Sequence, residues 1–300
     1  MKSALLLRSP LIAPKFMRLL ILLVFAIGIP VVSLAQATAS APPAAKQSIP
    51  EAHYIPSRDF DTKHIKLELR FDWEREQAIG VETITLSPLL TNLRNIELDA
   101  ANMTFASVKL ASGESLKFEV DQAKQKLKIA LNKVYQPAQE MTLIIDYRTN
   151  GPTLESGLLG AFGGGLTFVK PTSADPGRPR QIWSQGESEY NHNWFACYDH
   201  PNDFTTSELI ATVEKPFVVI SNGKLIKQKD NTDGTRTFHW SIDQPHATYL
   251  TSIVVGEYLP IEANYAGIPV ITYVYPKEAT EGKISAARIA DMVKFFSEKT

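Results

Sequence analysis

Alternating apolar and polar residues recur along the chain from about residue 63 onward. Residues 65–71 and 141–147 show the alternation most clearly. A period of two residues predicts strands with one face in a core and the other toward solvent. Shorter apolar stretches continue the series at residues 79–86, 96–98, 108–110, 116–120, 127–131, 209–213, 217–220, 225–226, 237–240 and 249–255. No helical period occurs among them, so the pattern predicts a mostly β, antiparallel, multi-stranded sandwich or saddle.

The pattern changes near residue 267. Residues 270–275 are predicted as one more strand, and a helical spacing of apolar residues follows. This stripe predicts an amphipathic helix that opens near Glu281. It consists of Ala286, Ile289, Met292, Val293 and Phe296. No glycine or proline stops the helix before Thr300, so we expect the first strand and helix of a following α/β-type domain that is cut short here.

The first 37 residues are organised like an export signal. The apolar run Leu19–Val32 follows Lys15 and Arg18, and residues 35–37 read Ala-Gln-Ala, a small-residue cleavage site. The run is shorter than the roughly 20 residues that a membrane-spanning helix needs, which favours cleavage. We therefore expect an exported, periplasmic or extracellular protein with no lasting membrane span. An uncleaved signal would leave it membrane-anchored.

Charge and cysteine content exclude several classes of protein. Cleavage after residue 37 removes four basic residues and no acidic ones, which changes the net charge from −1 to −5. No run of lysine or arginine remains, so we expect no nucleic-acid partner. The single cysteine, Cys197, excludes an internal disulfide framework and is expected to be a small buried residue.

Site-forming side chains concentrate in the stretch Gln185–Pro201. It contains the carboxylates Glu187 and Glu189, the histidines His192 and His200, the only cysteine and an aromatic pair. Polar groups at this density indicate a loop on a rigid scaffold, where binding sites commonly lie. The alternative is a solvated surface loop that is anchored by its buried aromatic pair.

The histidines lack the spacing of a zinc peptidase. Such a site needs two histidines at i and i+4 of a helix, with a glutamate after the first. None of the six histidines is followed by glutamate, and His192 and His200 are eight residues apart. The sequence therefore predicts no metal site and no catalytic residue in this chain. A thiol enzyme that pairs Cys197 with His192 or His200 is one alternative.

Several short motifs follow one another in a recognisable order. Residues 185–187 read Gln-Gly-Glu, and residues 196–201 read Ala-Cys-Tyr-Asp-His-Pro. Further motifs follow at Thr206–Leu209, Val219–Gly223, Phe238–Trp240, Pro245–Leu250 and Val254–Tyr258. This series resembles the N-terminal β domain of the M1 family of zinc aminopeptidases, of the aminopeptidase N-like, exported bacterial type. Ala196 stands where that family usually has proline, and Phe204 where a basic residue is common.

The resemblance implies a division of the chain. Residues 1–37 would be a signal peptide, 38–62 a flexible leader, 63–266 the N-terminal β domain, and 267–300 the start of the truncated peptidase catalytic domain. The parent protein would be a zinc-dependent aminopeptidase that removes N-terminal residues from peptides. Its zinc ligands are expected beyond Thr300, so this chain alone is expected to be inactive.

The resemblance also assigns substrate recognition to two residues. Glu187 is expected to bind the free α-amine of a peptide, and Gln185 to line the pocket for the first side chain. A carboxylate facing a desolvated ammonium makes a strong, charge-assisted hydrogen bond, which suits this role. Glu189 and Tyr190 are expected at the rim, and Asp199 as a structural residue.

Two kinds of partner follow from this interpretation: peptide N-termini and the chain's own downstream catalytic domain. A reading from another class is a non-catalytic β-sandwich interaction module on the same scaffold. The gene sequence past codon 300 discriminates between them, because an in-frame His-Glu-x-x-His favours the enzyme and a nearby stop favours the module.

We predict that the chain without residues 1–37 binds no stoichiometric zinc and hydrolyses no aminoacyl anilide. The reason is the missing ligand spacing and the missing general base. Metal analysis and an anilide assay of the purified chain check this, with a zinc-loaded peptidase as the positive control. One tightly held zinc per chain, or turnover that a chelator abolishes, would contradict the prediction.

Overall fold

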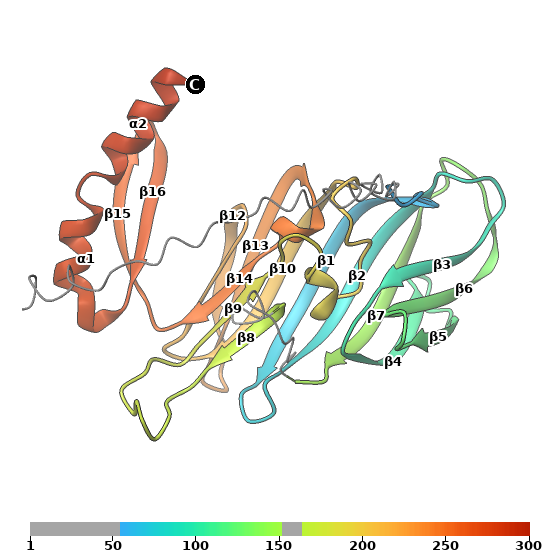
Figure 1. Cartoon of the computed structure of the whole chain (residues 1–300), viewed down its shortest axis with the longest axis horizontal. Coiled ribbons are helices and arrows are strands. Elements are labelled where there is room, and N and C mark those ends of the chain that lie inside the picture. The colour runs from blue at the N-terminus through green and yellow to red at the C-terminus, as the bar shows by residue number, and fades with distance from the viewer. Residues whose placement is uncertain (1–54, 152–163) are drawn as a thin grey trace, which may run out of the picture. The chain divides into compact units, whose positions relative to one another are not determined.

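The computed structural model describes residues 55–151 and 164–300 (Figure 1). Within these ranges the chain forms sixteen strands and two α-helices. The expected signal peptide and most of the leader lie outside the described residues. No helix in the described ranges is both long and apolar enough to cross a membrane.

The largest layer is a seven-stranded sheet in the order β12-β13-β10-β1-β2-β7-β4 (Figure 1). Its members are β1 (Phe60–Asp72), β2 (Gln77–Pro88), β4 (Met103–Leu110), β7 (Met141–Thr149), β10 (Thr205–Glu214), β12 (Lys224–Asp230) and β13 (Thr235–His246). Five of the six neighbouring pairs are antiparallel, as the alternation predicts. The pair β1 and β10 is parallel, with His64 opposite Thr206. A long crossover connection separates these two strands in the sequence, as parallel pairing requires.

Two smaller sheets share the core with the large one. One has the order β3-β6-β5 and the other the order β11-β14-β9-β8. The first contains β3 (Leu93–Asp99), β5 (Lys117–Asp121) and β6 (Lys126–Tyr135). The second contains β8 (Gly165–Val169), β9 (Gln181–Gln185), β11 (Val218–Ser221) and β14 (Ile253–Gly256). Leu67 of the large sheet, Ile129 of β6 and Ile182 of β9 all belong to one buried apolar cluster, so the mostly β sandwich predicted from the sequence is confirmed.

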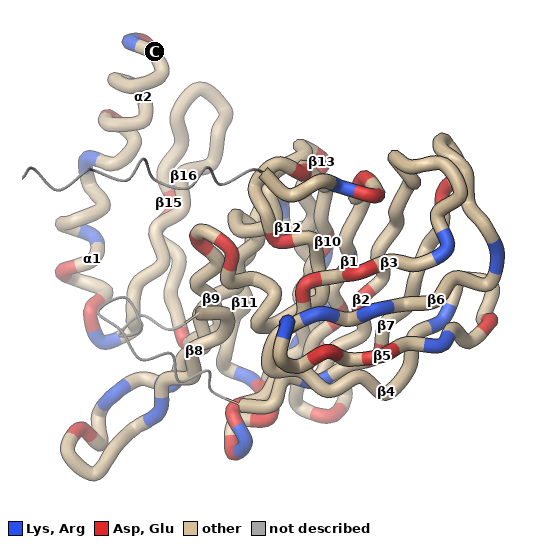
Figure 2. Tube along the Cα trace, turned by 45° about the vertical axis from the view of Figure 1, so that its right-hand side comes forward, with Lys and Arg blue, Asp and Glu red and all other residues tan. Residues whose placement is uncertain are grey.

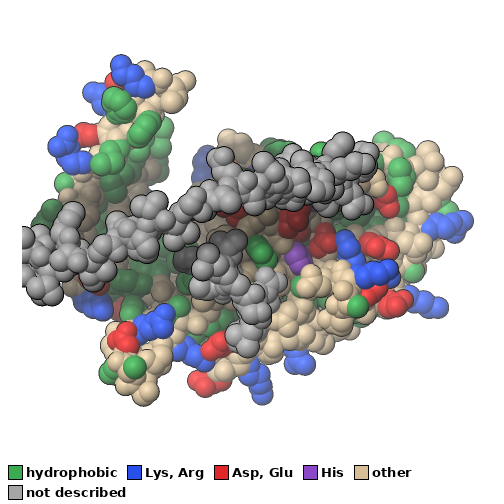
Figure 3. Space-filling model, viewed as in Figure 1, with side chains coloured by type: hydrophobic (Ala, Val, Ile, Leu, Met, Phe, Trp, Pro, Cys, Tyr) green, Lys and Arg blue, Asp and Glu red, His purple; other side chains and the backbone are tan. Residues whose placement is uncertain are grey.

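The C-terminal part contains the hairpin β15 (Leu259–Tyr265) and β16 (Ile268–Val274), followed by α1 (Ala279–Ala286) and α2 (Ile289–Lys299). The helix predicted here is present, but it is divided into two helices that meet at Ala287 and Arg288. The Ala287 N–H bonds to Ile284 O, three residues back, which tightens and ends α1. Hydrophobic side chains lie on the surface of both helices (Figure 3), and Ile284, Met292 and Phe296 are among the exposed ones.

Two other predictions at this end of the sequence need correction. Residues 249–255 do not form one strand: Thr248–Leu250 is a 3-10 turn, and only Ile253–Gly256 is β14. The turn arises because the Leu250 N–H bonds to Ala247 O at 3.0 Å. Strand β15 was not predicted, since most of its residues are exposed and Pro260 interrupts the pattern.

One carboxyl group lies inside the core of the large sheet. Glu82 on β2 is fully buried, and its Oε2 accepts a hydrogen bond from the Ala196 N–H at 3.1 Å. Its other oxygen and the hydroxyl of buried Tyr147 have no hydrogen-bond partner in the described part of the chain. Burial raises the pKa of Glu82 well above its ordinary value of 4.5, and the Ala196 hydrogen bond opposes this only in part. Burial therefore favours the protonated form of Glu82 in the folded protein.

We predict that Glu82→Gln removes a pH dependence of stability. Above pH 4.5 the unfolded chain loses the Glu82 proton and the folded chain keeps it, so the free energy of unfolding falls as pH rises. The loss is at most about 1.4 kcal/mol per pH unit, until the raised pKa is reached. Urea unfolding at pH 5 to 8 should show that the free energy of unfolding of the variant increases relative to that of the wild type as the pH rises.

The matched control is Glu119→Gln, which makes the same change at an exposed position of β5. It should leave the stability profile of the wild type unchanged. A gap between Glu82→Gln and wild type that stays constant over this pH range would show that Glu82 titrates normally in the fold.

Candidate functional site

The two predicted recognition residues lie where β9 ends. This strand pairs with β8 on one side, where Gln185 lies opposite Gly165, and with β14 on the other, where Trp183 lies opposite Val254. Ile182 anchors it in the core. Gln185 is half-buried as the last residue of β9, and Glu187 follows on the exposed turn. The predicted loop thus begins directly from a strand held on both sides.

Gly186 makes the turn out of β9 possible. It is buried, and a Cβ there would overlap the carbonyl oxygen of Tyr249 and lie 2.5 Å from Asn191 Oδ1. Any other residue would push the loop away from these two groups. The middle position of the Gln-Gly-Glu motif is therefore fixed by close packing.

A buried amide holds the loop to the 248–251 turn. The Asn191 side chain donates to Thr248 O and, at 2.9 Å, to Thr251 O. Its Oδ1 accepts a hydrogen bond from Trp194 Nε1 at 2.7 Å. All the polar atoms of this amide are bonded, as a buried amide requires. The sequence analysis did not single out Asn191, because these partners are 57 and 60 residues away in the chain.

Asp199 fastens the far end of the loop. Its Oδ2 accepts a hydrogen bond from the backbone N–H of His192 at 3.0 Å. The same oxygen lies 2.7 Å from Nδ1 of the His192 ring, at hydrogen-bond distance. Its Oδ1 accepts from the Thr248 hydroxyl at 3.3 Å. Asp199 is buried, so these contacts confirm the structural role expected for it.

Cys197 lies in the core and bridges to β3 through its backbone. Its carbonyl oxygen accepts from the Asp99 N–H at 2.6 Å, and its own N–H donates to Asp99 O at 3.1 Å. Burial raises the pKa of the thiol well above its ordinary value, and Asp199 and Asp99 raise it further. A thiol in such surroundings is a poor nucleophile. The buried role expected for Cys197 is confirmed, and the geometry does not support the thiol-enzyme alternative.

The two glutamates of the loop differ in their surroundings. Both are exposed, but Glu189 Oε1 lies 3.7 Å from His200 Nε2. Within residues 55–151 and 164–300, no basic side chain lies within ion-pair distance of the Glu187 carboxylate. Gln185 Nε2 points toward the Glu187 carbonyl oxygen at 3.5 Å. The carboxylate of Glu187 is therefore the one available to an incoming cation.

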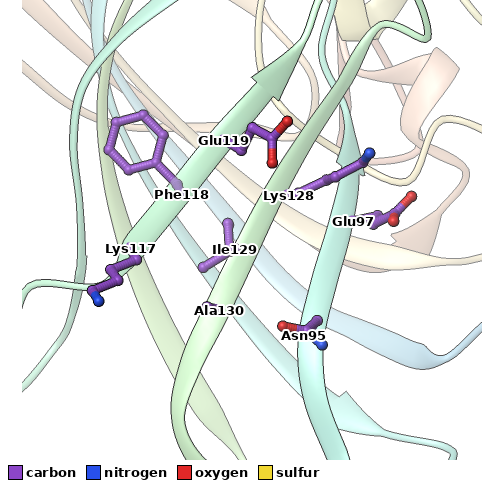
Figure 4. Close-up of a pocket in the computed structure, with 8 residues that line it drawn as sticks. All are labelled: Asn95, Glu97, Lys117, Phe118, Glu119, Lys128, Ile129 and Ala130. Atoms are coloured by element: carbon purple, nitrogen blue, oxygen red, sulfur yellow. The ribbon is translucent and has the colours of Figure 1, made fainter.

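The described residues contain no group of three or more His, Cys, Asp or Glu side chains that could hold a metal ion. A hollow of about 480 Å³ lies on the outer face of the β3-β6-β5 sheet (Figure 4). Acidic and basic residues alternate across these strands (Figure 2), and Lys128 lies opposite both Glu97 and Glu119. Lys128 Nζ already pairs with Asp121 Oδ2 at 3.1 Å, and none of the predicted site residues lines the hollow.

Comparison with known proteins places this geometry in a family. Residues 61–250 match the family model described as the peptidase M1 N-terminal domain. Probable aminopeptidase 1 of Saccharolobus solfataricus is 26% identical over 234 residues, which cover 78% of this chain and 27% of that protein. The chain spans about a quarter of the length of this relative and of two other curated archaeal aminopeptidases.

Solved structures share the fold. The M1 zinc metallopeptidase of Deinococcus radiodurans is 21% identical with a TM-score of 0.60, over 72% of this chain and 47% of that one. A mutant of it bound to a Tyr-Ser-Ala substrate gives a TM-score of 0.59 at 20% identity, over the same shares of the two chains. The family model covers well over half of the 300 residues and includes β9 and the whole Gln185–Pro201 loop. The chain belongs to the peptidase M1 N-terminal domain family.

Proposed function

We propose that this chain is the N-terminal substrate-recognition domain of a zinc-dependent aminopeptidase, a hydrolase that removes N-terminal residues from peptides. Family membership and the aminopeptidase names of the curated relatives support the reaction class. The tripeptide substrate bound by the Deinococcus radiodurans neighbour supports peptide as the substrate class. The observation that carries the proposal is the exposed carboxylate of Glu187, which has no basic partner among the described residues.

In this proposal Glu187 binds the α-ammonium of the substrate and Gln185 lines the pocket for its first side chain. An ammonium that leaves water needs an opposing negative charge, and a carboxylate supplies it in a charge-assisted hydrogen bond. Holding the terminal amine fixes which peptide bond reaches the reacting centre. The enzyme would therefore cleave one residue at a time from the N-terminus.

The zinc ion belongs elsewhere in the parent protein. The described residues contain no group of ligands that could hold it, and the role proposed for them is recognition. We assign zinc to a downstream catalytic domain, which also is the chain's intramolecular partner. The greater length of the relatives supports such a domain.

The same proposal includes export and the domain limits. Residues 1–37 would act as a signal peptide and direct the enzyme to the periplasm or the cell exterior. Residues 63–266 would form the β domain, and residues 267–300 would begin the catalytic one. The polarity pattern of the first 37 residues supports the first assignment. The proposed limit after residue 266 falls in the turn between β15 and β16.

We predict that Glu187→Gln in the parent enzyme lowers kcat/KM for free-amine peptides roughly thirtyfold or more. Removing one partner of a desolvated charge pair costs about 2–5 kcal/mol, and each tenfold change corresponds to about 1.4 kcal/mol. Steady-state kinetics on aminoacyl anilides checks the loss. Zinc content and melting temperature should stay at wild-type values, since the side chain is exposed and keeps its shape.

The matched control is Glu189→Gln, two residues away on the same exposed turn, which should cost little. Near-normal kcat/KM in Glu187→Gln together with a large loss in Glu189→Gln would show that the assignment is displaced by two residues. If neither substitution changes kcat/KM, the loop does not reach the substrate and the proposed function of this stretch fails.

A further inference from the structure

Three polar side chains join β9 to the hairpin β15–β16. The hydroxyl of Tyr258 donates to Gln181 Oε1 at 2.9 Å, and the hydroxyl of Tyr275 donates to the same oxygen at 2.7 Å. The two phenol rings stack with their centroids 5.3 Å apart. An amide oxygen has two lone pairs, so it can accept both hydrogen bonds. We call Gln181, Tyr258 and Tyr275 the Gln181 clamp.

The clamp closes both ends of the hairpin. Tyr258 immediately precedes β15, and Tyr275 immediately follows β16. Gly256 leaves room for this arrangement, because a Cβ there would lie 2.5 Å from the Tyr258 ring. Burial raises the pKa of the Tyr258 hydroxyl above its ordinary value, and the neighbouring Tyr275 raises it further. The hydroxyl therefore stays protonated and able to donate.

The clamp connects the hairpin and the two C-terminal helices to the rest of the described chain by hydrogen bonds. Strands β15 and β16 pair only with each other. In the described part of the chain, the bond from Tyr275 to Gln181 is the only hydrogen bond that joins residues 259–300 to residues 55–257. A unit held by so few directional contacts changes its orientation when one of them is lost.

The clamp and the recognition residues share one strand. Gln181 and Gln185 are the first and last residues of β9, and residues four apart in a strand lie on the same face. At about 3.3 Å per residue they are about 13 Å apart. The pairing of β9 with β8 and β14 makes the strand a rigid link between them.

We propose that the Gln181 clamp is a positioning device for substrate recognition. It fixes the β15–β16 hairpin, with α1 and α2, against the strand that ends in the recognition loop. It thereby sets the distance from Glu187 to the domain that continues from α2. Gln181, Tyr258 and Tyr275 act here through β9 and do not touch the substrate. The positioning role rests on the proposed function, whereas the fixed orientation of the hairpin does not.

The first test measures orientation in the chain itself. Spin labels at Asn95→Cys on β3 and Lys294→Cys on α2, both exposed, report one distance across the clamp. Buried Cys197 is inaccessible to the label. We expect a narrow distance distribution in the wild-type chain and a broader one in Gln181→Leu. Gln181→Glu keeps an acceptor at this position, so its distribution should be as narrow as that of the wild type. Tyr275→Phe, a milder change, should broaden it as well. An unchanged distribution in both Gln181→Leu and Tyr275→Phe would overturn the inference.

The second test measures catalysis in the parent enzyme. Gln181→Leu removes the acceptor of two hydrogen bonds, so kcat/KM for free-amine peptides should fall about tenfold, which corresponds to about 1.4 kcal/mol. We expect most of the loss in KM, with unchanged zinc content, and recovery in Gln181→Glu. The matched control is Tyr273→Phe, which removes a hydroxyl from the same hairpin that has no hydrogen-bond partner among the described residues.

The outcomes separate the clamp from the proposed function. A broadened distance with normal kcat/KM would overturn the positioning role. A loss of kcat/KM in Gln181→Leu that Gln181→Glu does not restore would also overturn it, since a general loss of stability would then explain the effect. A failure of the proposed function shows instead as normal activity in Glu187→Gln, and leaves the distance measurement unaffected.

Discussion

The Gln185–Pro201 loop depends on the buried side-chain amide of Asn191. It bonds to two backbone carbonyls of the 248–251 turn and accepts a hydrogen bond from the indole N–H of Trp194, so the loop and the turn meet on one side chain. Gly186 is packed against the same amide oxygen. Without the amide, these buried groups would lose their partners, at a cost of about 1–3 kcal/mol each. The backbone path of the loop at Gly186 is thus held by a side chain that is itself fully buried.

Local pattern was sufficient for most of the fold. Strands such as β1 and β7 bury about every second residue, and this alternation is visible in the sequence. Strand β9 was missed because Gln181, Ser184 and Gln185 are polar on a strand covered from both sides. The parallel pairing of β1 with β10 was missed because periodicity contains no information about neighbours. Partners distant in sequence decided these features.

The same division applies to the candidate site. Gln185 and Glu187 could be proposed as site residues from the Gln-Gly-Glu motif, since a motif of adjacent residues is visible in the sequence. The supports of that loop were not predictable, because Glu82 meets Ala196 across 114 residues and Gln181 meets Tyr275 across 94. Ala196 has an N–H to donate to Glu82, which proline in its place would lack. A departure from the family motif is therefore matched by a buried acceptor elsewhere.

The parallel contact between β1 and β10 also has a consequence for the order of folding. His64 and Thr206 are opposite one another, although 142 positions separate them along the chain. The middle of the large sheet therefore stays open until β10 has been synthesised, and β13 can add only after that. Contacts between such distant segments close slowly, because the loop entropy is lost before the pairing is gained. During synthesis, the β1 edge of the β1–β2 hairpin has no partner until β10 appears. At this edge a nascent chain is most open to pairing with another copy of itself.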